Sequence, residues 1–240
     1  MKIRKVTRLG RRLLKLKYCG AVIVAAGSAS RMGGIDKVMA PLDGKPMIYH
    51  TVRAFQNCDA IKEIVVVTRE DLLSTVMGLC KDMDKLKAVV VGGKDRPESV
   101  HMGLNALSDQ VKLVAVQDGA RPLVSEAVID RTVRAANTYG AAAPGVPVKD
   151  TVKTVQGGLV SDTPDRSALR AVQTPQVFDY DLLRGALKKA KVDGAVITDD
   201  CSAVERLGFK VKIVEGEERN IKITTPLDLK IAQLLWEEEE

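Results

Sequence analysis

The sequence predicts a three-layer α/β fold, with a parallel sheet between two layers of helices and a β-hairpin projecting from it. Short apolar runs typical of buried strands recur along the chain, and capped helical segments separate them. A change of pattern after Pro147 predicts the hairpin. The length of 240 residues is sufficient for one domain with its own core.

Four apolar runs predict the strands of the sheet. Residues 21–26 (AVIVAA) end at a glycine, as expected of a strand that is buried on both faces. Residues 64–67, 89–91 and 113–116 repeat this pattern. Because crossovers between parallel strands are right-handed, the loops that follow these strands are expected at one edge of the sheet, where ligands bind.

Local start signals predict the helices that separate the strands. Two helices, over roughly 46–57 and 97–107, begin beside a proline, which is favoured in the first turn. Ser125 is suited to cap a third helix that runs to about residue 139.

The pattern changes over residues 148–172, where Thr and Val residues flank a Gly157-Gly158 turn, and this predicts the projecting hairpin. The α/β pattern then resumes with helices near 179–190 and 199–207, a strand over 210–214 and a last helix from Pro226. Thr225 and Asp228 predict a capping box at the start of that last helix.

Positive charge is concentrated at the N-terminus. Residues 1–17 carry eight Lys and Arg residues and no acid, so the net charge of +6 for the whole chain leaves −2 for residues 18–240. This distribution, with an aromatic content of 3%, argues against nucleic acid as a partner. We expect residues 1–18 to form a basic, solvated or loosely docked extension, with a peripheral contact to anionic lipid as the alternative.

The cysteines and the hydropathy pattern bear on the cellular compartment. The four cysteines form no CxxC pair, and their spacing fits neither a zinc site nor a disulfide framework. No stretch approaches the roughly 20 apolar residues of a membrane span, so stable membrane insertion is not expected. These features predict a cytoplasmic protein with reduced thiols.

The loop after the first predicted strand has the composition of a phosphate-binding loop. Residues 25–37 (AAGSASRMGGIDK) combine small residues, which let a ligand approach the backbone, with the cations Arg31 and Lys37. The loop contains neither GxGxxG nor a Walker A motif, so neither a dinucleotide fold nor a P-loop NTPase is indicated. For this segment alone, a solvated surface turn is the alternative.

Seven later motifs occur at 92–100 (GGKDRPESV), 118–122 (DGARP), 147–151 (PVKDT), 165–166 (DR), 174–176 (TPQ), 198–200 (TDD) and 220–222 (NIK). With the first loop, over about residues 20–235, they resemble the 2-C-methyl-D-erythritol 4-phosphate cytidylyltransferase family. The resemblance implies a Rossmann-like nucleotide-diphosphosugar transferase fold. It also implies a cytidylyltransferase domain over residues 19–236, with residues 148–172 as an arm for dimerisation.

The activity implied by the resemblance is transfer of a cytidylyl group from CTP to 2-C-methyl-D-erythritol 4-phosphate, releasing pyrophosphate, in non-mevalonate isoprenoid precursor biosynthesis. Since one anionic phosphate attacks another, catalysis should depend on positioning and on convergent cations. By resemblance, Arg31 and Lys37 contact the triphosphate, and Lys222 stabilises the pentacoordinate phosphorus. Five residues separate Arg31 from Lys37, where the family often has six.

The resemblance also implies the binding residues. Those for CTP are Ala25, Ala26, Gly27, Ser28, Gly93, Lys94, Ser99, Asp118 and Gly119. Those for the acceptor are Asp118, Arg121, Thr151, Arg166, Thr174 and Thr198. In the family the arm crosses to a second subunit, so the resemblance implies a homodimer with composite sites. Mg²⁺ is expected with CTP, commonly through phosphate oxygens, and no metal-ligating side chain is assigned.

Two other functions remain open from the residues. A ribitol 5-phosphate cytidylyltransferase would share the first loop and the motif at 118–122. A nucleotide-sensing module without turnover is the alternative outside enzymes. Arg96 is expected either to brace the loop at 93–99 or to form a structural ion pair.

Overall fold

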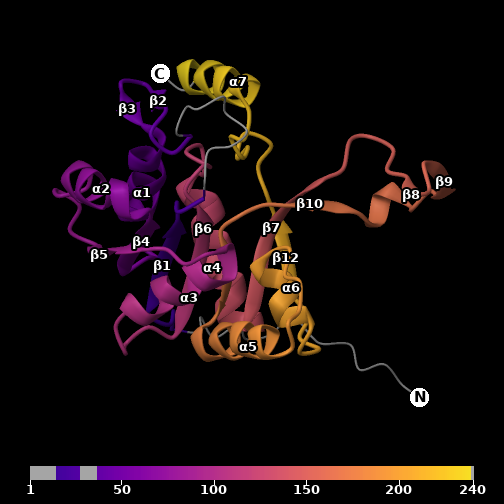
Figure 1. Ribbon diagram of the computed structural model, residues 1–240, viewed down its shortest axis with the longest axis horizontal. Helices are drawn as coiled ribbons and strands as arrows, with labels where there is room; N and C mark the ends of the chain where they lie inside the picture. The colour runs from indigo at the N-terminus through magenta and orange to yellow at the C-terminus, as the bar shows by residue number, and fades with distance from the viewer. Residues whose placement is uncertain (1–14, 28–36, 239–240) are drawn as a thin grey trace.

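A computed structural model describes residues 15–27 and 37–238, and a mixed sheet forms its centre (Figure 1). Strands β1 (Cys19–Val24), β4 (Glu63–Thr68), β5 (Leu86–Val91) and β6 (Leu113–Asp118) pair in parallel in the order β5-β4-β1-β6. The predicted run at 21–26 is partly wrong, because the strand ends at Val24 and the two alanines that follow lie in a loop. All six residues of β4 and of β6 are buried, as predicted for strands covered on both faces.

The other side of the sheet is partly antiparallel, so the prediction of a parallel sheet is wrong there. It contains β7 (Ala141–Pro147), β10 (Arg170–Val172), β11 (Gln176–Asp179) and β12 (Lys212–Glu215). Strand β11 runs antiparallel to β6 and to β7, β10 runs antiparallel to β7, and β12 runs parallel to β7. The chain returns from the hairpin arm without a helical crossover, so it re-enters the sheet in the opposite direction.

Helices cover both faces of the sheet. One layer contains α1 (Met47–Asn57), α2 (Leu73–Leu79) and α4 (Glu126–Tyr139), and the other contains α3 (Arg96–Ala106), α5 (Tyr180–Val192) and α6 (Asp200–Glu205). A Cβ atom on Gly103 would lie 2.3 Å from a methyl carbon of Val22, so glycine lets α3 approach the sheet closely. The predicted three-layer arrangement is therefore correct, although α2 was not predicted.

Helix starts follow the predicted signals. The hydroxyl of Ser125 accepts a hydrogen bond of 3.2 Å from the backbone N–H of Val128 at the start of α4. Helix α7 (Pro226–Glu237) begins at the predicted capping box. This helix packs beside a short hairpin of β2 (Pro41–Leu42) and β3 (Lys45–Pro46). Its Trp236 ring also contacts the ring of His50 in α1, with 4.3 Å between the ring centroids.

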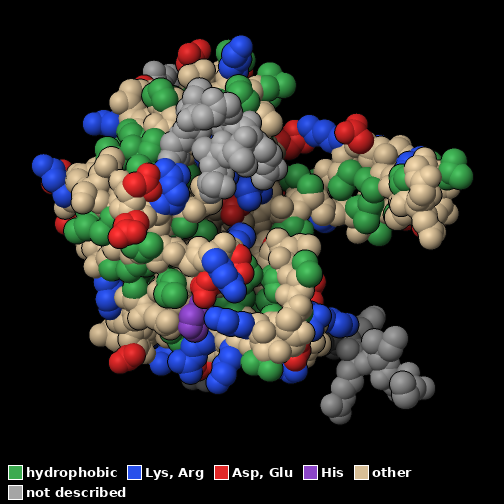
Figure 2. All heavy atoms as spheres, in the orientation of Figure 1, with side chains coloured by type: hydrophobic (Ala, Val, Ile, Leu, Met, Phe, Trp, Pro, Cys, Tyr) green, Lys and Arg blue, Asp and Glu red, His purple; other side chains and the backbone are tan. Residues whose placement is uncertain are grey.

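The predicted hairpin forms an arm that projects from the body of the molecule (Figure 1). Strands β8 (Thr154–Gln156) and β9 (Leu159–Asp162) pair only with each other among the described residues. The short helix η2 (Arg166–Ala168) follows them, and a second short helix, η1 (Glu70–Leu72), precedes α2. Apolar side chains on the arm are exposed, with Leu159 76% exposed (Figure 2). No helix in the described part of the chain is long and apolar enough to cross a membrane.

Candidate active site

A cavity of about 390 Å³ lies where β1, β5 and β6 end, at the edge that the sequence predicted. Its walls come from five separate stretches of the chain. The lining residues are Val24, Ala25, Ala26, Gly27, Lys37, Val38, Gly93, Lys94, Asp95, Arg96, Ser99, Asp118, Gly119, Ala120 and Lys222. The set combines small residues with several cations, which suits a phosphate-bearing ligand.

Two glycines let the loops of the cavity floor lie unusually close together. A Cβ atom on Gly92 would lie 2.4 Å from the Cβ of Ala26, and one on Gly119 would lie 3.0 Å from the Cβ of Ala25. Because real Cβ atoms do not approach as closely as the first of these distances, a side chain at Gly92 would push the β1 and β5 loops apart.

The start of α3 forms one wall and is fixed by its own hydrogen bonds. The Ser99 hydroxyl donates to the backbone carbonyl of Asp95 at 2.9 Å and accepts from the N–H of Gly93 at 3.1 Å. The N–H of Lys94 donates to the Glu98 carboxylate at 3.0 Å. The loop at 93–95 is thus held without Arg96, and the helix presents its partially positive end at this wall of the cavity.

Asp118 at the end of β6 is the electrostatic centre of the site. Its carboxylate lies 3.2 Å from Nη2 of Arg96, 3.0 Å from Nζ of Lys222 and 3.4 Å from Nε of Arg121. Burial acts to raise the pKa of Asp118, but the three cations outweigh burial and lower it to about 2. Asp118 is therefore ionised near neutral pH and holds Lys222 at the cavity wall.

Arg96 contacts a second buried carboxylate, that of Asp200 at the start of α6. Nη1 of Arg96 donates to the Asp200 carboxylate at 2.7 Å. Asp200 is 1% exposed, and this burial raises its pKa even though Arg96 opposes the shift. Of the two roles expected for Arg96, the structure shows ion pairing, while bracing of the 93–95 loop falls to Ser99 and Glu98.

Buried hydrogen bonds hold three segments together behind Asp118. Nη1 of Arg121 donates to the backbone carbonyl of Asn220 at 2.6 Å. The Asn220 amide donates to the backbone carbonyl of Thr174 at 2.9 Å, and the Thr174 hydroxyl accepts from the N–H of Asp118 at 3.2 Å. Since each of these residues is at most 9% exposed, the network fixes the position from which Lys222 reaches the cavity.

The structure gathers most of the residues predicted from the sequence. Ten of them line the cavity: Ala25, Ala26, Gly27, Lys37, Gly93, Lys94, Ser99, Asp118, Gly119 and Lys222. Arg121 and Thr174 contact Asp118 directly. The predicted positions Ser28 and Arg31 lie outside the described residues.

Of the six predicted acceptor residues, only Asp118 lines this cavity; Arg121 and Thr174 lie behind it, and the other three lie elsewhere. Thr198, two residues before Asp200, is exposed. Its backbone N–H donates to the Ser202 hydroxyl at 3.2 Å. Thr151 and Arg166 lie on the exposed arm. The predicted acceptor residues are thus divided between the body and the arm of one chain.

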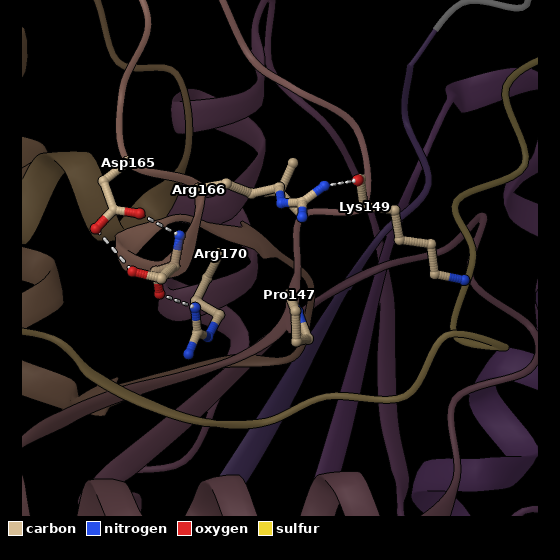
Figure 3. Close-up of a pocket in the computed structure, with 7 residues that line it drawn as sticks. Pro147, Lys149, Asp165, Arg166 and Arg170 are labelled. Carbon is tan, nitrogen blue, oxygen red and sulfur yellow. Dashed lines mark hydrogen bonds between the residues drawn. The ribbon is translucent and has the colours of Figure 1, made fainter.

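Arg166 lines a second, open cavity of about 690 Å³ at the base of the arm (Figure 3). Its guanidinium donates to the backbone carbonyl of Lys149, and Nη1 of Arg170 donates to the backbone carbonyl of Ser167 at 3.0 Å. Asp165 accepts from the N–H of Ser167 at 2.9 Å, which shapes the turn that carries Arg166. These residues form a basic surface that suits an anionic group.

The described residues do not form a metal site by themselves. No group of three or more His, Cys, Asp or Glu side chains gathers within the described ranges. The carboxylate of Asp118 already contacts three cations, so it is not free to serve as the core of a cation site.

Sequence reasoning missed the role of Asp200. Asp200 belongs to the motif at 198–200 and directly follows Asp199, the N-cap of α6, but neither feature indicates a partner in α3. Its pairing with Arg96, over a separation of 104 residues, emerges from the tertiary structure.

Comparisons with known proteins show which family the chain resembles. A sequence model described as 2-C-methyl-D-erythritol 4-phosphate cytidylyltransferase matches residues 19–238. A protein of that name from Caldanaerobacter subterraneus is 45% identical over 224 residues, covering 89% of this chain and 96% of the relative. One from Symbiobacterium thermophilum is 44% identical over 220 residues, covering 91% and 92%.

Solved structures show the same fold. The crystal structure of 4-diphosphocytidyl-2C-methyl-D-erythritol synthase from Anaerococcus prevotii matches with a TM-score of 0.84 and 33% identity, covering 92% of this chain and 96% of that one. The crystal structure of 2-C-methyl-D-erythritol 4-phosphate cytidylyltransferase from Thermus thermophilus matches with a TM-score of 0.75 and 34% identity, covering 90% and 98%.

Proposed function

This chain belongs to the 2-C-methyl-D-erythritol 4-phosphate cytidylyltransferase family, and we propose how its cavity carries out the reaction. The enzyme transfers a cytidylyl group from CTP to 2-C-methyl-D-erythritol 4-phosphate and releases pyrophosphate, in isoprenoid precursor biosynthesis. The roles of individual residues, the metal and the assembly described below are our proposals.

One observation supports the proposal most directly: Lys37 and Lys222, which are far apart in the sequence, line the same cavity as the start of α3. The reaction brings two anionic phosphates together, so it needs cations on more than one side of the reacting phosphorus. Two unit charges ~4 Å apart interact by about 4 kcal/mol at an effective dielectric near 20, which exceeds a neutral hydrogen bond of about 1 kcal/mol.

The cavity divides into a nucleotide side and an acceptor side. The small loop at 25–27 and the start of α3, with Gly93, Lys94 and Ser99, would hold CTP. Asp118, with Arg121 and Thr174 behind it, would face the acceptor. The backbone groups of the fixed loop at 93–95 are suited to select cytosine by hydrogen bonding. A wrong base would leave buried polar groups of the loop or of the base unpaired.

The transfer step exchanges one phosphorus–oxygen bond for another. A phosphate oxygen of the acceptor attacks the α-phosphorus of CTP, and the bond to the leaving pyrophosphate breaks. Because a phosphate monoester is already an anionic nucleophile near neutral pH, no side chain has to remove a proton. Lys37 and Lys222 stabilise the charge on the transferring phosphoryl group and the leaving group, and the family resemblance implies the same role for Arg31, which lies outside the described residues.

A divalent cation is proposed to accompany CTP. The described side chains form no metal site of their own, so the ion would be carried by phosphate oxygens and water. Mg²⁺ would neutralise phosphate charge, while the protein side chains position the two substrates. Chelation by EDTA should abolish turnover and excess Mg²⁺ should restore it, and turnover that persists without divalent ions would contradict this proposal.

The arm is proposed to form a homodimer with composite sites. A two-stranded hairpin is marginal alone, and this one exposes Val155, Leu159 and Val160. Arg166 lies away from the main cavity of its own chain, so a second copy could receive it at the acceptor side.

Mixing two inactive variants tests the composite site. Arg166→Ala and Lys222→Ala should each be weakly active as pure proteins. After they are mixed and subunits exchange, each heterodimer should contain one intact site, and activity should rise. If the mixture is no more active than its components while heterodimers form, Arg166 does not act across the interface.

The function is tested by pyrophosphate release with CTP and each of two acceptors. We expect turnover with 2-C-methyl-D-erythritol 4-phosphate, and far less with ribitol 5-phosphate or with GTP in place of CTP. Preference for ribitol 5-phosphate would identify the other cytidylyltransferase, and CTP binding without turnover would identify a sensing module. Since all four cysteines are free and buried, we also propose that the enzyme works in the reducing cytoplasm.

A further inference from the structure

The pairing of Arg96 with two buried carboxylates is not explained by the reaction as described. Arg96 lies in the first turn of α3, on the nucleotide side, but its guanidinium contacts Asp118 at 3.2 Å and Asp200 at 2.7 Å. The loop at 93–95 is held by other hydrogen bonds, so Arg96 is not needed to fix that loop.

Asp200 depends on Arg96 more than Asp118 does. Asp118 keeps two other cations, Arg121 and Lys222, whereas Arg96 is the only side chain in the described ranges that pairs with the Asp200 carboxylate. A carboxylate that is 1% exposed carries a large desolvation cost when it is ionised and unpaired. Without Arg96, Asp200 would therefore have to become neutral or move toward water.

Movement of Asp200 would disturb the acceptor side rather than the nucleotide side. Asp200 follows Thr198 by two residues, and Thr198 was predicted to contact the acceptor. The carboxylate of the neighbouring Asp199 accepts from the Gln176 amide at 2.8 Å, and Oε1 of Gln176 accepts from the N–H of Cys201 at 3.0 Å. A shift of this turn would therefore be transmitted to β11 and to the edge of the acceptor site.

We propose that Arg96 is a positioning residue for the acceptor, which fixes the position of Asp118 relative to the turn at 198–200 through its contacts to both buried carboxylates. It acts through the two carboxylates, without needing a contact to either substrate. The proposal rests on the proposed function, since it concerns the acceptor of that reaction.

The first test compares Arg96→Met with a matched control, Arg131→Met. Arg131 pairs with Glu217 at 2.6 Å and is similarly exposed, at 31% against 28% for Arg96, but it lies on α4 in the other helical layer. We expect Arg96→Met to lower kcat/KM for the acceptor by about 100-fold, as for a broken buried pair, while KM for CTP changes by less than about threefold. The control should retain wild-type kinetics.

The second test is rescue by neutralising Asp200. Arg96→Met leaves a buried, unpaired carboxylate at Asp200. Adding Asp200→Asn should therefore raise kcat/KM for the acceptor about tenfold or more above that of Arg96→Met. Thermal unfolding of each variant reports the folded fraction, and kinetics are normalised to it. A fully folded Arg96→Met protein that Asp200→Asn fails to rescue would overturn the proposal.

A pH profile separates positioning from general loss of structure. The charged groups that face Asp200 are Arg96 from α3, Asp118 from β6 and its neighbour Asp199. Without Arg96, protonation of Asp200 should relieve the defect, so activity of Arg96→Met relative to wild type should rise as pH falls. Adding Asp200→Asn should remove that dependence.

The outcomes distinguish this proposal from the function itself. If wild type and Arg131→Met both turn over and Arg96→Met is equally active, the positioning role is wrong and the function stands. If the main loss in Arg96→Met is in KM for CTP, Arg96 is a nucleotide contact and the proposal is overturned. If wild type itself does not turn over, the proposed function fails instead.

Discussion

Replacement of Lys222 by alanine should lower kcat far more than it weakens CTP binding. Lys222 reaches the cavity from the segment after Asn220, with its Nζ 3.0 Å from the Asp118 carboxylate. Because Arg96 and Arg121 still pair with Asp118 in the variant, the site should keep its shape. The loss should therefore appear as missing charge at the reacting phosphorus.

The size of the effect follows from charge and exposure. A cation ~4 Å from a unit of developing negative charge contributes about 4 kcal/mol at an effective dielectric near 20. The Lys222 side chain is 41% exposed, so solvent screening reduces this contribution, and we take about half of it, ~2 kcal/mol. That corresponds to a decrease in kcat of about 30-fold.

The assay is steady-state pyrophosphate release, with the CTP dissociation constant measured separately by calorimetry. Lys230→Ala, which removes an exposed lysine from α7, is the matched control and should leave both values unchanged. If Lys222→Ala weakens CTP binding and lowers kcat by the same factor, Lys222 binds the ground state and our reasoning about the phosphorus is wrong.

Three other predictions concern stability and reactivity. The pKa of Asp118 is about 2 in the folded protein against an ordinary value of 3.8, so Asp118 should stabilise the fold by about 2 kcal/mol above pH ~4 and lose that contribution as pH falls to ~2. Acid unfolding monitored by circular dichroism should therefore be steeper over this range for wild type than for Asp118→Asn, and equal slopes would contradict it. Burial raises the pKa of the Cys19 and Cys201 thiols, and all four thiols are buried, so Ellman's reagent at pH 8 should react with the native protein only after unfolding; rapid native labelling would be inconsistent with this core. Ser125→Ala should lower the free energy of unfolding by about 1 kcal/mol in urea titrations through loss of the α4 cap, with kcat unchanged.

Much of the site could be predicted because its chemistry is local in the sequence. The small residues of the first loop follow β1, the start of α3 follows β5, and Asp118 ends β6, and parallel strands bring their carboxyl ends to one edge. The cap at Ser125 and the capping box at Thr225 were visible for the same reason, since each involves residues at most three positions apart.

Other features could not be predicted because they depend on contacts between distant residues. The direction of β11 follows from how the chain returns from the arm, and only its pairing with β6 and β7 reveals that direction. Thr151 and Arg166 occur in family motifs, yet the arm carries them away from the main cavity, so a motif alone did not place them.

The sequence by itself determined the layered α/β fold and the loops that supply the site, because strand and helix periodicity and capping signals involve neighbouring residues. The cytidylyl transfer followed from the resemblance of its ordered motifs to a known family. Only the tertiary structure decided which charges meet. Arg96 contacts both Asp118 and Asp200, which lie 22 and 104 residues away in the sequence. These contacts depend on burial and on how distant segments pack, and no local sequence pattern specifies either.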